Sequence, residues 1–390
     1  MRGLGVVATT PQGSRQLWVA LPEVSVIGLN AAGDAWLAAL CSDAPTVNQV
    51  AVPLPATPLE RTYCVFKIDV AAATSAGQRF GLQPHVRLGT GDVYGSSPNT
   101  IGRLTSSVEA VWMVAHNGVL IGLAPTSDEG LVVHVRADAD LSITAVGSST
   151  TIVGPGANVL VRLRPDGSLA WAAPLYRSPD VDFRTLDHGT LVVHPSGEIT
   201  AAGGLFVQQA TFGSGSEATS YDAKGFYSLD GLEVGAGGDG YIARVTADGI
   251  LRWVRFLTPL SKYGSAITSI SVDDEGILFA GHYNRNALLT DGGAGVFLSD
   301  VLGEGFPDAP PTGGVIGRFD EAGNLTWWRG HHGSFTSIAR SSRDPAIVAT
   351  LHRCEGSAGF PPAVQEETTS CKDVALSFNA NLGFECSRNH

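Results

Sequence analysis

Three aspartates close together in the chain come nearest to a metal site by type and spacing. Asp180, Asp182 and Asp187 fall in a stretch between two strand-like segments, where carboxylates of one loop can ligate calcium. Their spacing differs from that of an EF-hand, and solvated loop acids would look the same. Calcium at these positions is therefore the one metal we test, and no other cofactor is expected.

Histidines offer a second possible ligand set. His134 and His194 each follow the tripeptide Leu-Val-Val. If both end strands that line a central channel, the pair could bind a metal or a small ligand. Histidines that flank turns give the same pattern, and this alternative stays open. His331, His332 and His352 show no metal-ligand spacing.

Motifs of catalysis and cofactor binding give little support for an enzyme. Neither G-x-S-x-G nor H-E-x-x-H occurs. Residues 235–240 match G-x-G-x-x-G, but they precede a strand rather than open a helix, which indicates a loop. Turn positions favour aspartate for their geometry alone, and this describes Asp166, Asp248, Asp273 and Asp274. No catalytic residue is assigned, and the sequence favours a protein that is not an enzyme.

The elements that would position these residues are revealed by an internal repeat. Residues 162–171, 244–253 and 318–327 align without gaps as R-x-x-x-x-G-x-L-x-W. Each copy predicts a β-hairpin, because an alternating strand enters a turn in which glycine supplies a positive φ. In the second strand, the leucine and the tryptophan lie on one face.

A second hairpin type alternates with the first, as in residues 191–203 and 270–281. Looser copies of both types occur along the rest of the chain, and no helical period interrupts them. Alternating hairpins of two types predict four-stranded antiparallel sheets. We name the strands of each sheet A to D in chain order, with the repeat hairpin as strands C and D. A β-sandwich is the alternative, although sandwiches rarely show internal repeats.

These motifs resemble the bacterial β-propeller repeat family with seven-bladed-propeller-type repeats, and more distantly PQQ-like propellers. The resemblance implies an all-β, single-domain propeller spanning residues 1–390, with six complete blades and an N-terminal half-blade at 4–21. A ring with seven positions is favoured, and closure with six blades is the alternative. The complete blades are expected at 24–81, 85–123, 131–172, 190–256, 266–329 and 335–387.

The half-blade and the first residues bear on the compartment. A propeller closes its ring by pairing strands from both termini, and this chain starts in the middle of a blade. The first residues also lack the long apolar segment of a secretory signal. We interpret both features as a truncation or a misplaced start, and we expect an extracytoplasmic protein that is secreted, periplasmic or attached to the cell surface.

Composition excludes two classes of partner. The net charge is −12, with 25 Lys and Arg against 37 Asp and Glu, so binding to nucleic acid is not expected. No run of apolar residues is long enough for a transmembrane helix.

Four cysteines occupy matching places in the repeat. Cys41 and Cys64 flank the connection between strands B and C of one blade, and Cys354 and Cys371 do so in the last blade. The spacing of neighbouring strands suits a disulfide, so we predict the bonds Cys41–Cys64 and Cys354–Cys371. Two disulfides would place the protein outside the cytoplasm, whereas free buried thiols are the cytosolic alternative. Cys386 has no predicted partner.

Loop lengths indicate where binding would occur. The A–B and C–D turns share one face and are short, whereas the B–C and D–A connections share the other face and carry nearly all the insertions. Long loops on a rigid scaffold commonly form binding sites. Aromatic residues in these loops are candidate ligand contacts, although they could equally pack their own loops: Phe206, Phe212, Tyr221, Phe226, Tyr227, Tyr283, Phe297 and Phe306.

The expected function is therefore a binding or scaffolding module that engages a protein or glycan through the face with long loops. Two alternatives follow from the more distant resemblance. One is a propeller enzyme of the quinoprotein-dehydrogenase type, and the other is a PQQ-like propeller that scaffolds the assembly of membrane proteins. No residues of this chain can be assigned to a quinone site.

Overall fold

The structure is a computed structural model whose regular elements are almost all β-strands. It describes most of the chain between residues 82 and 355, and mainly strands outside that region. The described residues are 4–10, 13–20, 25–29, 35–40, 46–47, 50–51, 63–68, 78–80, 82–88, 90–105, 109–137, 139–152, 156–179, 189–205, 207–223, 228–229, 232–233, 238–260, 264–284, 286–290, 295–298, 312–332, 334–340, 347–355, 370–378 and 384–387.

Most of these strands belong to antiparallel sets of four that follow one another along the chain. Among the described strands there are six such sets, which we call blades 1 to 6. Blade 1 consists of β3 (Ser25–Leu29), β4 (Ala35–Leu40), β7 (Tyr63–Ile68) and β8 (Gln78–Phe80). Blade 2 consists of β9 (Gln83–Arg87), β10 (Val93–Ser97), β11 (Thr100–Leu104) and β12 (Ala110–His116). Blade 3 consists of β13 (Val119–Pro125), β14 (Leu131–Ala137), β17 (Ala157–Leu163) and β18 (Leu169–Arg177). Blade 4 consists of β19 (Gly189–Val193), β20 (Ile199–Leu205), β25 (Asp239–Val245) and β26 (Leu251–Pro259). Blade 5 consists of β27 (Ser265–Asp273), β28 (Gly276–Asn284), β31 (Thr312–Phe319) and β32 (Leu325–His332). Blade 6 consists of β33 (Ser334–Arg340), β34 (Ile347–Glu355), β35 (Ser370–Phe378) and β36 (Phe384–Ser387).

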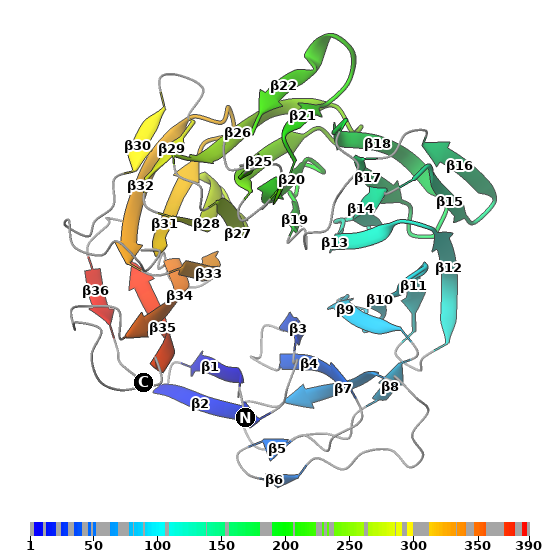
Figure 1. The fold of residues 1–390 in the computed structure, drawn as a ribbon. Helices are drawn as coiled ribbons and strands as arrows, with labels where there is room; N and C mark the ends of the chain where they lie inside the picture. Colours follow the sequence, from blue (N-terminus) through cyan, green and yellow to red (C-terminus); the bar gives the residue numbers. More distant parts are fainter. Residues whose placement is uncertain are drawn as a thin grey trace.

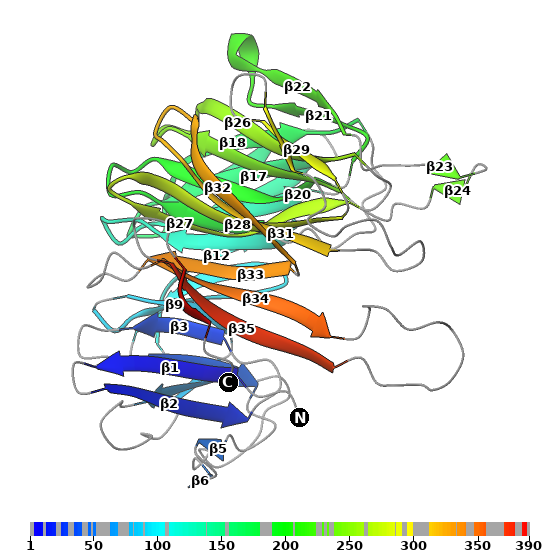
Figure 2. The same ribbon diagram turned by 90° about the vertical axis from the view of Figure 1, so that its left-hand side faces the viewer.

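The blades surround a central axis, with strand A of each blade innermost (Figure 1). Successive innermost strands contact one another: β3 with β9, β9 with β13, β13 with β19, β19 with β27, and β27 with β33. The strands β1 (Leu4–Thr10) and β2 (Gly13–Ala20) pair with each other and lie between blade 6 and blade 1 in Figure 1. Figure 2 shows them below blade 6. This radial arrangement of antiparallel sheets is a β-propeller, which confirms the expected fold class.

The blades have two rims with different connections. Because neighbouring strands run antiparallel, the A–B and C–D turns lie at one rim, which we call the turn rim, and the B–C and D–A connections lie at the other, which we call the connection rim (Figure 2). Turns of the turn rim are short, as between β27 and β28, whereas the B–C connections of blades 1, 3, 4 and 5 carry extra strands.

One blade boundary differs from the sequence expectation. One blade was expected at 85–123 and the next at 131–172, so that residues 112–120 would belong to a single blade. Instead, β12 pairs with β11, and β13 pairs with β14 of the next sheet. The turn at Gly118 therefore joins strand D of blade 2 to strand A of blade 3. A Cβ at Gly118 would lie 2.4 Å from Val135 of β14, so the turn packs against blade 3.

The hydrophobic core lies between the blades. One apolar cluster contains Val132 and Leu160 of blade 3 together with Ile199 and Tyr241 of blade 4. Every residue of β25 is buried, because both faces of blade 4 are covered by neighbouring blades. A strand covered on both faces no longer shows the alternation of buried and exposed residues that a half-exposed strand shows.

Four B–C connections contain a hairpin that extends the outer edge of the preceding sheet. We call these hairpins the outer hairpins: β5–β6 (Thr46–Val47, Val50–Ala51), β15–β16 (Leu141–Ala145, Ser148–Ile152), β21–β22 (Gln209–Phe212, Thr219–Asp222) and β29–β30 (Ala287–Leu289, Val296–Leu298). Their first strands pair with β2, β12, β18 and β26, respectively. Each outer hairpin thus covers a strand edge that would otherwise present unpaired backbone groups (Figure 1).

A shorter pair, β23 (Ser228–Leu229) and β24 (Leu232–Glu233), projects at the connection rim (Figure 2). Within the described ranges, no helix is long and apolar enough to cross a membrane.

Candidate functional site

The repeat tryptophans connect neighbouring blades at the turn rim. In blades 2, 3 and 4 the indole Nε1 on strand D donates a hydrogen bond to a backbone carbonyl in the C–D turn of the next blade. The pairs are Trp112 with Pro165 (2.9 Å), Trp171 with Ala247 (2.8 Å) and Trp253 with Glu321 (3.1 Å). The three tryptophans are therefore anchors between blades.

The repeat glycines complete these contacts. Gly167 and Gly323 have φ values of 79° and 81°, which disfavour any residue with a side chain. A Cβ on Gly167 would lie 2.6 Å from Trp112, and one on Gly323 would lie 2.7 Å from Trp253. The glycine serves the turn of its own blade and also leaves room for the tryptophan of the preceding blade.

A fourth copy of the repeat was missed from the sequence. Arg103 and Trp112 have the same separation as the arginine and the tryptophan of the other copies, and they pair across β11 and β12 as Arg162 pairs with Trp171. Val108 stands where the other copies have glycine, which concealed the copy. The separation of arginine and tryptophan alone would have revealed it.

The repeat arginines form ion pairs with acids in the A–B turn of their own blade. The pairs are Arg103 with Asp92 (2.8 Å), Arg162 with Asp128 (3.6 Å), Arg244 with Glu198 (2.6 Å), and Arg318 with both Asp273 (2.7 Å) and Glu275. Asp273, which the sequence analysis assigned to turn geometry, therefore also has an electrostatic partner.

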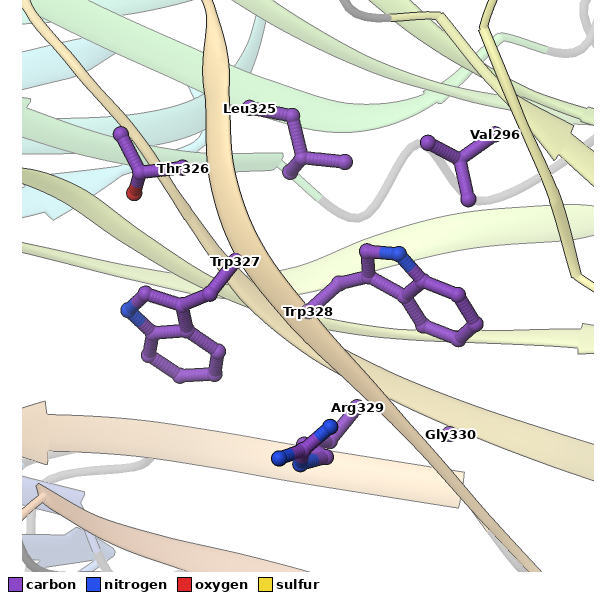
Figure 3. A pocket seen from close by; sticks show the side chains of 7 residues that line it. All are labelled: Val296, Leu325, Thr326, Trp327, Trp328, Arg329 and Gly330. Atoms are coloured by element: carbon purple, nitrogen blue, oxygen red, sulfur yellow. The ribbon is translucent and has the colours of Figure 1, made fainter. Parts of the chain in front are cut away.

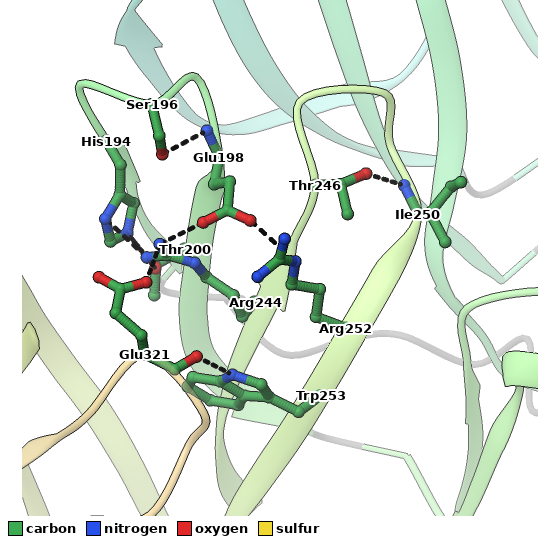
Figure 4. A network of polar contacts seen from close by, with 10 residues as sticks. All are labelled: His194, Ser196, Glu198, Thr200, Arg244, Thr246, Ile250, Arg252, Trp253 and Glu321. Atoms are coloured by element: carbon green, nitrogen blue, oxygen red, sulfur yellow. Dashed lines mark hydrogen bonds and ion pairs between the residues drawn. The ribbon is translucent and has the colours of Figure 1, made fainter.

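The most buried of these pairs is at the boundary between blades 4 and 5 (Figure 4). The Arg244 side chain is 1% exposed, and its Nη2 donates to Glu198 and to Glu321, each at 2.6 Å. Glu198 also accepts a hydrogen bond from Arg252. Because Glu321 belongs to the C–D turn of blade 5, Arg244 links two blades through a charged network.

His194 lies inside this network, where it packs against the Arg244 guanidinium and is 2.7 Å from the Thr200 hydroxyl. Burial and the charge of Arg244 lower the pKa of His194 to about 4. The imidazole is therefore neutral at pH 7 and inaccessible to a substrate. His194 thus contacts Thr200 and Arg244 of its own blade.

His134 and His194 occupy different positions in their blades. The sequence analysis placed both at the end of strand A, but His134 lies within β14, the second strand of blade 3, because β14 pairs with β13 on one side and β17 on the other. His134 is 1% exposed, and burial lowers its pKa to about 4. It therefore belongs to the interior of the protein, and the two histidines form no ligand pair in the channel.

The aromatic candidates fall into three groups. Phe212 and Tyr283 are 0% and 1% exposed and lie in the core, which favours the packing alternative for them. Phe297, on β30, is 55% exposed, and its role as a ligand contact stays a prediction. Outside the described residues are Phe206, Phe226, Tyr227 and Phe306.

Tyr221 fastens an outer hairpin to the next blade. Its ring stacks on Phe256 of β26 with a centroid distance of 3.6 Å, and its hydroxyl lies 2.5 Å from Asp239 and 2.6 Å from Thr258. Burial and the neighbouring Asp239 carboxylate raise the pKa of Tyr221. These contacts give Tyr221 a packing role.

The predicted calcium ligands and one predicted disulfide are not placed. Asp180, Asp182, Asp187 and Cys41 lie outside the described residues, so calcium and the Cys41–Cys64 bond stay predictions. Elsewhere in the described chain, no cluster of three potential metal ligands occurs. Cys354 and Cys371 are direct backbone partners across β34 and β35, a register in which the Cα separation suits a disulfide.

A groove of about 530 Å³ lies at the outer circumference, beside β32 and β30 (Figure 3). Its lining is formed by Val296 of β30 and residues 325–330 of β32, including Trp327, Trp328 and Arg329. Thr326 and Arg329 are exposed, whereas both tryptophans are half-buried. The groove combines apolar walls with the edge of a strand, and no sequence signal indicated it.

Comparisons with known sequences returned no relative. No protein-family model matches the chain, and no curated protein matches it.

Comparisons with solved structures returned several distant likenesses. BamB from Moraxella catarrhalis is 10% identical, with 85% of this chain and 94% of that chain covered and a TM-score of 0.34. An apocarotenoid oxygenase mutant from Synechocystis is 10% identical, with 98% and 82% covered and a TM-score of 0.38. A DUF4221 family member from Bacteroides vulgatus is 6% identical, with 86% and 92% covered and a TM-score of 0.34. These include both enzymes and other proteins, and at such scores none of them assigns a function to this chain.

Proposed function

We propose that this protein is a non-catalytic binding or scaffolding propeller that acts outside the cytoplasm and engages a protein or glycan through its connection rim. The observation that carries the proposal is the difference between the two rims. Turns of the turn rim are short and occupied by contacts between blades, whereas the B–C connections are long in blades 3, 4 and 5. Variable loops on a rigid scaffold are suited to recognition.

Within the long connections, the outer hairpins have a structural role, so the proposed contact region is narrower than the whole connection. β21 and β29 complete neighbouring sheets, and Phe212, Leu289 and Leu298 are buried. The parts that follow them, residues 224–237 and 299–311, can be replaced without removing these strands. Both contain aromatic candidates, among them Phe226, Tyr227 and Phe306.

The experiment replaces residues 224–237 and 299–311 with short Gly-Ser linkers in the full-length protein. Glycan arrays and chemical cross-linking with extracytoplasmic extract of the source organism then compare this variant with the native chain. We expect every specific interaction to weaken in the loop variant. The control variant Ile250→Ala alters an exposed residue of the turn rim and should bind as the native chain does. If all interactions of the native chain survive in the loop variant, the proposal is overturned.

The proposed compartment has a separate test. We expect mass spectrometry of the non-reduced protein to find a peptide linked through Cys354 and Cys371, since these residues face each other in the β34–β35 register. The same experiment tests the Cys41–Cys64 bond. Free thiols at all four positions after secretion would contradict the extracytoplasmic assignment. Calcium at Asp180, Asp182 and Asp187 is tested by whether added Ca²⁺ raises the melting temperature of the native chain but not of a variant with asparagine at these three positions.

A further inference from the structure

The second strand of each outer hairpin is the outermost strand of its sheet, so one of its edges faces away from the blades (Figure 1). An exposed strand edge can pair with another chain, and natural proteins prevent this with very short edge strands, charged side chains or proline. Two of the four edges are short, since β6 has two residues and β30 has three. A third, on β22, carries the exposed carboxylate of Asp222.

The fourth edge, on β16, has none of these protections. The strand contains five residues, Ser148–Ile152, and none of them is charged or proline. Three of the five are β-branched, which favours an extended backbone. Ser148, Ser149 and Thr151 are exposed. Within the part of the chain that the structure describes, β16 pairs only with β15.

The surface beside this edge is also uncharged. One face of the sheet formed by β12, β15 and β16 presents exposed side chains that are all apolar or carry a hydroxyl group. They are Val111, Met113 and Ala115 of β12, Ser142 and Thr144 of β15, and Ser149 and Thr151 of β16. The chain as a whole has a net charge of −12. Two copies of the chain therefore approach each other most easily where neither presents a charge.

The register of the hairpin shows which backbone groups of β16 are free. The strands β15 and β16 are joined by a two-residue turn at 146–147, and the residues that flank the turn pair with each other. Such a flanking pair exchanges hydrogen bonds, and pairs with and without hydrogen bonds then alternate along the ladder. Every second residue of β16, beginning with Ser148, therefore bonds to β15. The N–H and C=O groups of Ser149 and Thr151 point outward.

We propose that two copies of this chain associate by antiparallel pairing of their β16 strands about a twofold axis at Thr150. In this register, Ser149 of each copy lies opposite Thr151 of the other, so every outward N–H group meets a C=O group. Thr150 faces its own counterpart, and threonine pairs across antiparallel strands are favourable. The contact joins the six-stranded sheets of the two copies into one continuous sheet.

Symmetry and charge favour a second copy over an unrelated polypeptide as the occupant of this edge. A twofold contact uses the same surface on both copies, so each chain already carries both halves of it. The edge and the face beside it bring no like charges together, although both copies are acidic overall. This contact goes beyond the proposed function, because it involves neither residues 224–237 nor residues 299–311.

Sedimentation velocity of the full-length protein over a range of concentrations tests the proposal. We expect monomers at low micromolar concentration and mostly dimers at about 1 mM, because one short strand pair buries less than the roughly 1,200 Å² of a stable complex. Hydrogen exchange should locate the contact. The amides of Ser149 and Thr151 should exchange more slowly as the dimer forms, whereas those of Ser148 and Thr150, which already bond to β15, should change little.

Charged variants test the antiparallel register. The double variant Ser149→Lys, Thr151→Lys places like charges opposite each other and should weaken the dimer at least about tenfold. The double variant Ser149→Glu, Thr151→Glu should do the same, but an equimolar mixture of the two variants should associate, since opposite charges then face each other. Both positions are exposed, so the melting temperature of the monomer should stay close to that of the native chain. The control Thr219→Lys, Ser220→Lys adds the same charge on the exposed strand β22 and should dimerise as the native chain does.

Three results would overturn the proposal. The first is a protein that stays monomeric at about 1 mM. The second is a dimer that the lysine variant at Ser149 and Thr151 does not weaken, which would place the contact elsewhere. The third is a mixture of the two charged variants that fails to associate, which would exclude the antiparallel register. Replacing residues 224–237 and 299–311 should leave the dimer unchanged, so this proposal and the proposed function can fail independently.

Discussion

The turn rim and the outer edge of the blades use the same repeat in different ways. At the turn rim, four arginines pair with acids of their own blade, and three tryptophans donate to the next blade, so each copy is constrained by two sheets. At the outer edge, blades 2 to 4 are covered by outer hairpins, and the β32 edge of blade 5 borders a groove. The comparison indicates that contacts at the turn rim maintain the architecture, while the outer edge and the connection rim are free to differ between blades.

The largest expected difference between these regions concerns two arginines. Arg244→Met should lower the free energy of unfolding by about 3 kcal/mol, because it removes the buried cation between Glu321 and Glu198, and Glu198 keeps only its ion pair with the more exposed Arg252. Arg329→Met, at the exposed outer edge, should change it by less than about 0.5 kcal/mol. Urea unfolding of both variants measures the difference. Equal losses would show that the turn rim has no special role in stability.

Low pH should lower the free energy of unfolding through two buried histidines, His134 in the interior and His194 at the turn rim. The pKa values of His134 and His194 are about 4 in the folded protein against 6.5 when exposed, so the folded state binds fewer protons between these values. The stabilisation is complete above pH 6.5 and is lost as the pH falls towards 4, by roughly 3 kcal/mol for His134 and in the same direction for His194. Urea unfolding between pH 7 and pH 4 measures this loss. A slope unchanged in a His134→Asn, His194→Gln double variant would contradict the assignment.

Substitutions at two glycines distinguish the cost of a positive φ from the cost of a contact between blades. Gly167→Ala should cost about 2–3 kcal/mol, since the new Cβ meets Trp112 at 2.6 Å and φ is positive. Gly215 also has a positive φ, but it lies at the tip of an outer hairpin with no atom near its Cβ position. Gly215→Ala should therefore cost only about 1 kcal/mol. Thermal unfolding compares the two, and equal costs would mean that the contact with Trp112 is unimportant.

The smallest effect concerns single hydrogen bonds. Trp171→Phe removes the bond from Nε1 to the Ala247 carbonyl and should cost about 1 kcal/mol more than Trp328→Phe, which replaces a half-buried indole in the groove. Both changes remove a similar apolar area, so the difference measured by urea unfolding reports the bond between blades. A larger loss for Trp328 would reverse the comparison.

Much of the fold was predictable because its signals are local. The repeat hairpins, their turn glycines and the short turns of one rim follow from residues that are close in the chain. The boundary at Gly118 was not predictable in this way, because a short turn with glycine can join two strands of one blade or two strands of neighbouring blades. Likewise, Arg103 and Trp112 were overlooked since their turn lacks glycine, although their pairing is the same.

The candidate site was less predictable than the fold. Aromatic residues in long connections were expected either to contact a ligand or to pack their own loops. Phe212 is buried because β21 folds back onto β18 of the preceding blade, and Tyr283 is buried within strand β28. The groove at β32 was not predictable, because its lining combines Val296 of β30 with residues 325–330 of β32, two strands that are separate in the sequence.

The sequence alone therefore determined that antiparallel hairpins repeat with fixed spacing, since alternation and turn residues act over a few neighbouring positions. Tertiary structure decided which hairpins share a sheet, which acid each arginine meets and which strand D each outer hairpin extends. Those outcomes depend on pairing between segments far apart in the chain. Backbone hydrogen bonds between strands are the same for every sequence, so only the packing of whole blades selects the partners.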